Sequence, residues 1–181
     1  PGRPAAMRPA ARPDAPRSAM LFYGLRTDIG AQNVMVGLPG KAWDCRESHS
    51  SRPRKSHVIC RPLASGKRFL MKVQMLGLSA ESAKLAVDQI VKRDLRKSYA
   101  WMVKEPKVEK QGPVKLAGRK GYSLEVSGKY RGTYAMRRLD QVIKVGNMML
   151  VATAWGEAQR FERLRPVVLK WFASLKIVKR K

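Results

Sequence analysis

The cysteine and histidine residues of the chain all lie in one short window, residues 45–60. They are Cys45, His49, His57 and Cys60. Thiolate and imidazole groups are the ligands that tetrahedral zinc prefers, and hairpins commonly supply them in pairs. The usual Cys-x2-Cys pairing is missing, which weighs against a zinc knuckle. Zinc is therefore only one interpretation of this window.

The same cysteines also suit a disulfide bond or a pair of buried free thiols. Cys45 and Cys60 fall on two short predicted strands, which a turn would bring side by side. A bond that closes a loop of this length contributes about 3 kcal/mol in the chain-entropy model. Two cysteines and no others suit an oxidising compartment. In this interpretation His49 and His57 are polar loop residues. The sequence leaves the three alternatives open.

The remaining residues offer little material for catalysis. Both histidines lie in the same window, so a Ser-His-Asp arrangement has no obvious base. The Gly-x-Ser-x-Gly elbow is absent, and so are the glycine patterns of phosphate and dinucleotide loops. Asp140 stands beside Arg137 and Arg138, where a cross-strand ion pair is a simpler interpretation than a general base. We therefore expect no enzyme, no catalytic residues and, zinc apart, no cofactor.

Positive charge dominates the composition. The 181 residues include 38 Lys and Arg against 13 Asp and Glu, which gives a formal net charge of +25. A compact domain with this surplus repels itself unless a partner supplies counter-charge. The expected partner is a large protein or ribonucleoprotein complex with an acidic surface, and RNA is an alternative. No apolar run is long enough for a transmembrane helix.

The candidate binding residues form three basic clusters, at the tip of the first predicted hairpin, across a later meander, and at the C-terminal end. They are Arg52, Arg54 and Lys55; Lys115, Arg119, Lys120, Lys129, Arg131, Arg137 and Arg138; and Lys179 with Arg180. Tyr122, Tyr130 and Tyr134 lie in the same meander. They are either core residues or a platform on which bases stack. Contacts to the nucleic-acid backbone are expected to dominate over base reading.

Hydrophobic periodicity indicates which elements position these residues. Residues 1–30 predict an extended Pro/Ala/Arg-rich arm, and residues 31–181 predict one domain. Within the domain, alternation predicts strands and a three-to-four spacing predicts helices. The strands are 33–38, 42–46, 57–61, 68–76, 119–127, 133–145 and 148–155, the helices are 80–97 and 157–175, and a charged connector spans 104–113. Pro166 is expected to kink or break the last helix. The order predicts an α+β fold, in which helices flank an antiparallel β-sheet.

Several short motifs resemble the PsbP-like superfamily, which includes the extrinsic lumenal subunit of photosystem II and many bacterial proteins. They are Val36-Gly37-Leu38-Pro39 followed by Trp43, Leu116-Ala117-Gly118-Arg119-Lys120-Gly121-Tyr122, Gly146 in the last hairpin, and Phe172-Ala173-Ser174-Leu175. The similarity spans residues 34–178 or so. It implies an α/β/α sandwich and a non-enzymatic accessory role on larger complexes. These motifs are structural, so no binding residues are transferred.

The expected function combines the charge with this resemblance. We expect an accessory subunit that docks through a strongly basic surface onto an anionic partner within a large complex. The alternative is a structural RNA-binding protein, such as a ribosomal or mitoribosomal component, that contacts the phosphate backbone. The expected location is extracytoplasmic, in a periplasm or organelle lumen, and the mitochondrial matrix goes with the alternative.

Overall fold

The computed structural model describes residues 20–23, 32–49, 56–95, 99 and 102–179. Most of the predicted N-terminal arm lies outside these residues. Its described part is the short strand β1 (Met20–Tyr23).

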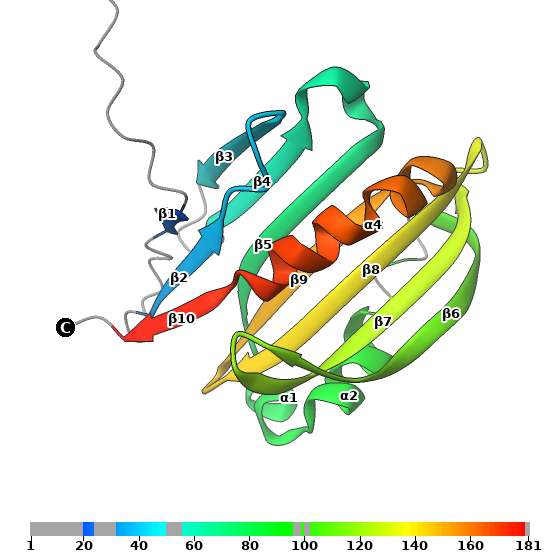
Figure 1. Ribbon diagram of the computed structural model, residues 1–181. Coiled ribbons are helices and arrows are strands. Elements are labelled where there is room, and N and C mark those ends of the chain that lie inside the picture. The colour runs from blue at the N-terminus through cyan, green and yellow to red at the C-terminus, as the bar shows by residue number, and fades with distance from the viewer. Residues whose placement is uncertain (1–19, 24–31, 50–55, 96–98, 100–101, 180–181) are drawn as a thin grey trace, which may run out of the picture.

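A large antiparallel sheet occupies the centre of the fold (Figure 1). Its seven strands in the described residues follow the order β3-β4-β5-β9-β8-β7-β6. Their bounds are β3 (Trp43–His49), β4 (Ser56–Pro62), β5 (Phe69–Gly77), β6 (Val103–Leu116), β7 (Arg119–Tyr130), β8 (Tyr134–Val145) and β9 (Met148–Glu157). A 3₁₀ segment, η1 (Leu63–Arg68), joins β4 to β5. The predicted meander is confirmed, and its last hairpin turns at Gly146 and Asn147.

A second, smaller sheet joins the two ends of the domain. The strand β2 (Gln32–Gly37) pairs with β1 on one side and with β10 (Lys176–Lys179) on the other. Ser174 strengthens this junction, because its hydroxyl accepts a hydrogen bond from the Gly37 amide at 2.9 Å.

The helix α4 (Ala158–Ala173) covers one face of the large sheet. Its predicted apolar stripe is confirmed, since Phe161, Val168, Trp171 and Phe172 are buried. They pack on alternate residues of β5, of which Phe69 and Met71 are fully buried. Gly156 on β9 makes room for Phe69, because a Cβ atom there would lie 2.5 Å from the ring. The helix continues through Pro166, so the break predicted there is absent from α4.

A second apolar core fills the opposite face. There Ile90 and Val91 pack on Leu124, Val142 and neighbouring strand residues. The sheet is therefore covered by helical segments on both faces, which confirms the predicted α+β fold.

The prediction of one continuous helix over 80–97 is wrong. The structure has α1 (Ala80–Lys84), α2 (Val87–Ile90) and a π-helical segment, η2 (Val91–Leu95). Leu85 and Ala86 between them are extended. The Lys144 ammonium donates to the carbonyl oxygens of Ala83 and Leu85, taking the place of helical amides. A lysine from β8 thus stabilises the break, which periodicity within the segment does not reveal.

The connector predicted over 104–113 is also wrong, because these residues belong to the edge strand β6. Its prolines and charges are the features that natural edge strands carry against unwanted pairing. The register shifts between Lys104 and Lys107 and again between Val108 and Lys110. These irregularities conceal the strand from a search for strict alternation.

We predict that Trp171→Ala lowers the free energy of unfolding by about 3–5 kcal/mol, because the indole is 2% exposed in the core beneath α4. Urea denaturation measures the change. The matched control is Leu169→Ala on the same helix, whose side chain is 44% exposed and whose loss should cost less than about 0.5 kcal/mol. A loss below 1 kcal/mol for Trp171→Ala would contradict the prediction.

Candidate polyanion-binding surface

The first and third predicted clusters fall largely outside the described residues. Arg52, Arg54, Lys55 and Arg180 are not described. Lys179 ends β10, and its side chain is not described either. The binding roles of these residues stay predictions.

The structure divides the second cluster between the two ends of β7. Lys115, Arg119 and Lys120 lie at the β6–β7 turn, where Lys115 is opposite Lys120. All three side chains are exposed. We call these residues the β6–β7 cation group.

Lys129 and Arg131 lie at the opposite end, at the β7–β8 turn, which begins at Arg131 because β7 runs on to Tyr130, past the predicted end of the strand at residue 127. The structure adds two exposed cations that the sequence did not single out, Lys104 and Arg68. Lys104 is opposite Lys129, and its side chain lies over Gly132, with Nζ 3.6 Å from where a Cβ would be. We call Arg68, Lys104, Lys129 and Arg131 the β7–β8 cation group.

The two groups are distinct sites. β7 has 12 residues, so its ends lie roughly 36 Å apart at the rise of an extended strand. Lys104 was missed because it fell in the predicted connector, and only the pairing of β6 with β7 places it beside Lys129.

Arg138 pairs with a buried acid inside the fold. Its Nε lies 2.8 Å from Asp140 on the same strand, so the predicted ion pair forms along β8 instead of across strands. The Tyr99 hydroxyl and the Thr153 hydroxyl also donate to this carboxylate. Burial raises the pKa of the Tyr99 phenol, and the Asp140 charge adds to that effect. The phenol is therefore a fixed proton donor in the physiological range.

Arg137 forms an ion pair with a second buried acid, Glu125, on the opposite face beneath α4. Its Nη1 lies 2.9 Å from Glu125, which also accepts two hydrogen bonds from Arg165. Glu162 on α4 pairs with both arginines. Burial alone would raise the pKa of Glu125, but the hydrogen bonds from Arg165 and Arg137 outweigh it and lower the pKa. This carboxylate therefore stays ionised near neutral pH and is a poor proton acceptor.

A groove of about 250 Å³ opens beside Glu125, between α4 and the strands β6, β7 and β8. Apolar, amide and charged groups line it in a mixture: Lys110, Gln111, Gly112, Pro113, Val114, Ser123, Glu125, Leu139, Gln141, Arg165 and Leu169. Its acid and its arginine already bond each other. The described lining thus holds no carboxylate poised for acid–base chemistry.

The meander tyrosines separate into two environments. Tyr122 packs against the core under α2, with the Lys92 ammonium 5.7 Å from its ring centre. Tyr130 and Tyr134 stack on each other at the β7–β8 turn, with ring centres 5.2 Å apart. Trp155 from β9 stacks on Tyr130 at 5.6 Å, with an interplanar angle of 10°. The sequence did not associate Trp155 with the tyrosines, because only the sheet register brings it there.

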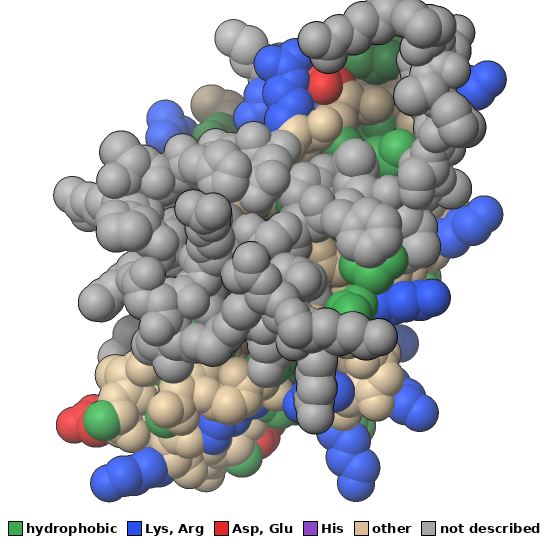
Figure 2. Space-filling model, turned by 90° about the vertical axis from the view of Figure 1, so that its left-hand side faces the viewer, with side chains coloured by type: hydrophobic (Ala, Val, Ile, Leu, Met, Phe, Trp, Pro, Cys, Tyr) green, Lys and Arg blue, Asp and Glu red, His purple; other side chains and the backbone are tan. Residues whose placement is uncertain are grey.

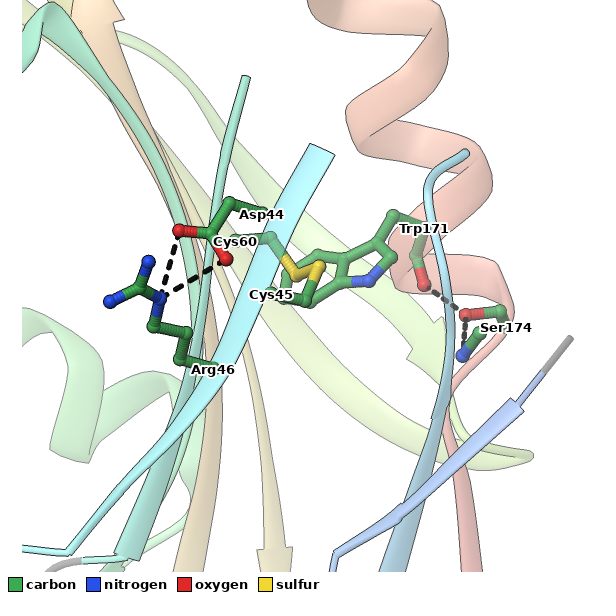
Figure 3. The surroundings of a disulfide bond; sticks show 7 residues. Asp44, Cys45, Arg46, Cys60, Trp171 and Ser174 are labelled. Carbon is green, nitrogen blue, oxygen red and sulfur yellow. Dashed lines mark hydrogen bonds and ion pairs between the residues drawn. A yellow bond between two sulfur atoms is a disulfide. The ribbon is translucent and has the colours of Figure 1, made fainter. Parts of the chain in front are cut away.

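The cysteines form the disulfide that was one of the alternatives (Figure 3). Cys45 and Cys60 are directly opposite in the β3–β4 pair, and the bond belongs to the same core as Trp171. Bonded sulfur atoms are not thiolate ligands. His57 lies on β4, whereas the side chain of His49 is not described. Within the described ranges, no three His, Cys, Asp or Glu side chains gather as a metal site.

Lysine and arginine side chains project around the rim of the face in Figure 2, and few acidic side chains are visible on it.

None of the helices in the described parts of the chain has the length and apolar character needed to cross a bilayer.

We predict that Glu125→Gln destabilises the protein by about 2 kcal/mol at pH 7, because the hydrogen bonds from Arg137 and Arg165 lose their anion. The lowered pKa of Glu125 means that its carboxylate contributes stability above the ordinary pKa, 4.5, and loses it as the pH falls further. The difference between variant and wild type should therefore shrink at pH 3. Denaturation at both pH values measures it, and a difference independent of pH would disprove the assignment.

Comparison with known proteins yields a likeness in structure. No family model matches the sequence, and no curated protein matches it. The solved structure of PsbP (CyanoP) from Synechocystis sp. PCC 6803 is similar with a TM-score of 0.62 at 12% identity, covering 94% of this chain and 100% of that one. LpqN of Mycobacterium tuberculosis, described as involved in cell envelope biogenesis, has a TM-score of 0.56 at 11% identity, covering 89% and 92%.

A third similar structure is PA94 of Pseudomonas aeruginosa, a protein of unknown function described as a putative regulator. Its TM-score is 0.51 at 13% identity, and the match covers 91% of this chain and 99% of that one. Likeness at such low identity is a likeness of fold. Together with the order of strands and helices described above, it shows that this chain has the PsbP-like fold.

Proposed function

We propose that the protein is a non-catalytic accessory subunit that docks through its basic surface onto an anionic partner within a larger complex. The observation that carries this proposal is that the acids along β7 and β8 are paired inside the fold, whereas the cations at the ends of β7 are exposed. The buried acids Glu125 and Asp140 are neutralised inside the fold by Arg137, Arg138 and Arg165. The cations at both ends of β7 are exposed instead.

The net charge of the chain also supports docking onto an anionic partner. The formal net charge of +25 is what is left after every acid has neutralised one base. A surplus of this size raises the association rate with anionic surfaces and destabilises the isolated compact state. An anionic partner removes both the repulsion and the solvent exposure of these side chains.

We further propose an extracytoplasmic location, in a periplasm or organelle lumen. The Cys45–Cys60 disulfide supports it, since such bonds persist in oxidising compartments. The role of the structurally similar LpqN in cell envelope biogenesis agrees with it. Neither observation favours the mitochondrial matrix.

RNA is the second candidate partner. The specific observation in its favour is the stack of Tyr134, Tyr130 and Trp155 beside the β7–β8 cation group. Nucleic-acid bases stack on aromatic rings, whereas the carboxylates of an acidic protein do not.

We predict that the purified protein binds a fluorescent oligoglutamate or an oligonucleotide at low salt, and that the affinity falls steeply as salt is raised. Charge reversal at Lys115, Arg119 and Lys120, or at Lys104, Lys129 and Arg131, should weaken binding at unchanged melting temperature. Fluorescence anisotropy measures the affinity.

The control for these variants reverses three exposed cations outside the predicted clusters, Lys84, Arg163 and Lys170, with the same change in net charge. If this control weakens binding as much as either group variant, net charge alone is responsible and docking through these groups is disproved. An absence of binding to both probes at low salt would disprove the proposed function.

A further inference from the structure

Three aromatic rings and two guanidinium groups come together at the β7–β8 end of the sheet, and two lysines, paired across β6 and β7, lie at the same end. The rings are Tyr130, Tyr134 and Trp155, and the cations are the β7–β8 cation group. We propose that this aromatic–cation site binds single-stranded nucleic acid, with bases on the rings and phosphates on the cations. The inference rests on the proposed function, because it names the chemistry of the anionic partner and the place where it binds.

The rings form a preorganised platform. They pack on a small core of Met102, Val103 and Met136, each at most 4% exposed. Tyr130 and Tyr134 are opposite each other in the β7–β8 pair, which fixes their separation. Each of the three rings is only partly buried, so part of its surface remains accessible. Fixed aromatic surfaces bind bases without the entropic cost of ordering side chains.

Guanidinium groups extend this platform. The Arg68 guanidinium lies over the Tyr134 ring, 5.3 Å from its centre, and the Arg131 guanidinium lies 5.6 Å from the centre of Tyr130. Guanidinium planes are themselves surfaces on which unpaired bases stack. The same two arginines carry charge that a phosphate neutralises. One pair of side chains thus offers both kinds of contact.

The cations of the site are not committed to acids within the described structure. The ion pairs found among the described residues use other cations, namely Arg46, Lys92, Lys107, Arg137, Arg138 and Arg165. Glu157 acts on Tyr134 electrostatically, and Glu105 follows Lys104 in sequence. Burial raises the pKa of the Tyr134 phenol, and the nearby Tyr130 adds to the effect, so the ring does not oppose an anion at neutral pH. The site therefore remains positive.

The β6–β7 cation group shows what a purely electrostatic site looks like in the same protein. Lys115, Arg119 and Lys120 are also exposed, but the ring contacts found among the described residues involve none of them. The contact on the same strand, at Tyr122, uses Lys92 from η2 instead. An acidic peptide would engage either end of β7. Only a ligand with exposed planar groups gains from the β7–β8 end, and single-stranded nucleic acid has them where a duplex hides them.

Three anionic probes test this assignment: a fluorescent 12-mer of uridylate, an inorganic polyphosphate of similar charge, and an oligoglutamate. Tyr134→Leu removes one ring, and Tyr122→Leu is the matched control, because Tyr122 also has a cation over its ring but lies away from the site. We expect Tyr134→Leu to weaken oligouridylate binding roughly 5- to 100-fold. Polyphosphate binding should change less than about twofold, and Tyr122→Leu should leave both affinities intact.

The double variant Lys104→Gln with Lys129→Gln tests the phosphate contacts. It should weaken oligouridylate and polyphosphate together, and it should reduce the salt dependence of oligouridylate binding by a slope of about 1.4. Melting temperatures identify any variant that fails to fold. For such a variant, Arg68→Gln replaces it as the test, because Arg68 is exposed.

The outcomes separate this inference from the proposed function. If Tyr134→Leu and Tyr122→Leu bind oligouridylate equally well, the aromatic–cation site is disproved while docking through charge stands. A wild-type preference for oligoglutamate over oligouridylate points to an acidic protein partner and also overturns the inference. If none of the three probes binds at low salt, the proposed function fails as well.

Discussion

Coverage of the central sheet on both faces is the constraint on which the distribution of charge in this protein depends. With α4 on one side and α1, α2 and η2 on the other, the middles of β7, β8 and β9 are removed from water. A charge placed there must be paired and hydrogen-bonded, because burying it alone is very costly. Glu125 and Asp140 obey this rule. Glu125 accepts hydrogen bonds from Arg137 and Arg165. Asp140 accepts them from Arg138 and from the Thr153 hydroxyl.

The same constraint determines where unpaired cations lie. In the meander, several lysines and arginines that no internal acid neutralises lie at turns and on the edge strand β6, where solvent reaches them. Lys115, Lys120, Lys129 and Arg131 are examples. The strand β6 also has prolines and register shifts, which protect an open edge from pairing with another chain. Surface charge and edge protection are therefore supplied by the same segment.

Local patterns predicted most of the fold and only part of the candidate surface. Strict alternation in β5 and the apolar stripe of α4 are signals within one element, so the sequence contains them. The break at Leu85 depends on Lys144, which lies far away in sequence, and no local pattern reports it. The resemblance of short structural motifs indicated the PsbP-like fold, which the similar structures confirm.

The candidate surface was harder to predict for the same reason. Sequence proximity grouped Arg119 with Arg131, although the strand between them separates them by its full length. It also grouped Arg137 and Arg138 with exposed cations, whereas adjacent residues of a strand point to opposite faces and each meets a buried acid. Lys104 and Trp155 joined the site only through pairing across strands, and Arg68 joined it through its contact with the Tyr134 ring.

The length of β7 has a consequence for how tightly a partner is held. The strand holds its two cationic ends apart, so a polyanion that docks as proposed and is long enough to span both ends binds bivalently. After one end detaches, the other keeps the chain at high effective concentration, and rebinding outpaces escape. A short anion gains nothing from this arrangement. The length of β7 thus favours the binding of extended polyanions over small anions, because only an extended chain reaches both ends.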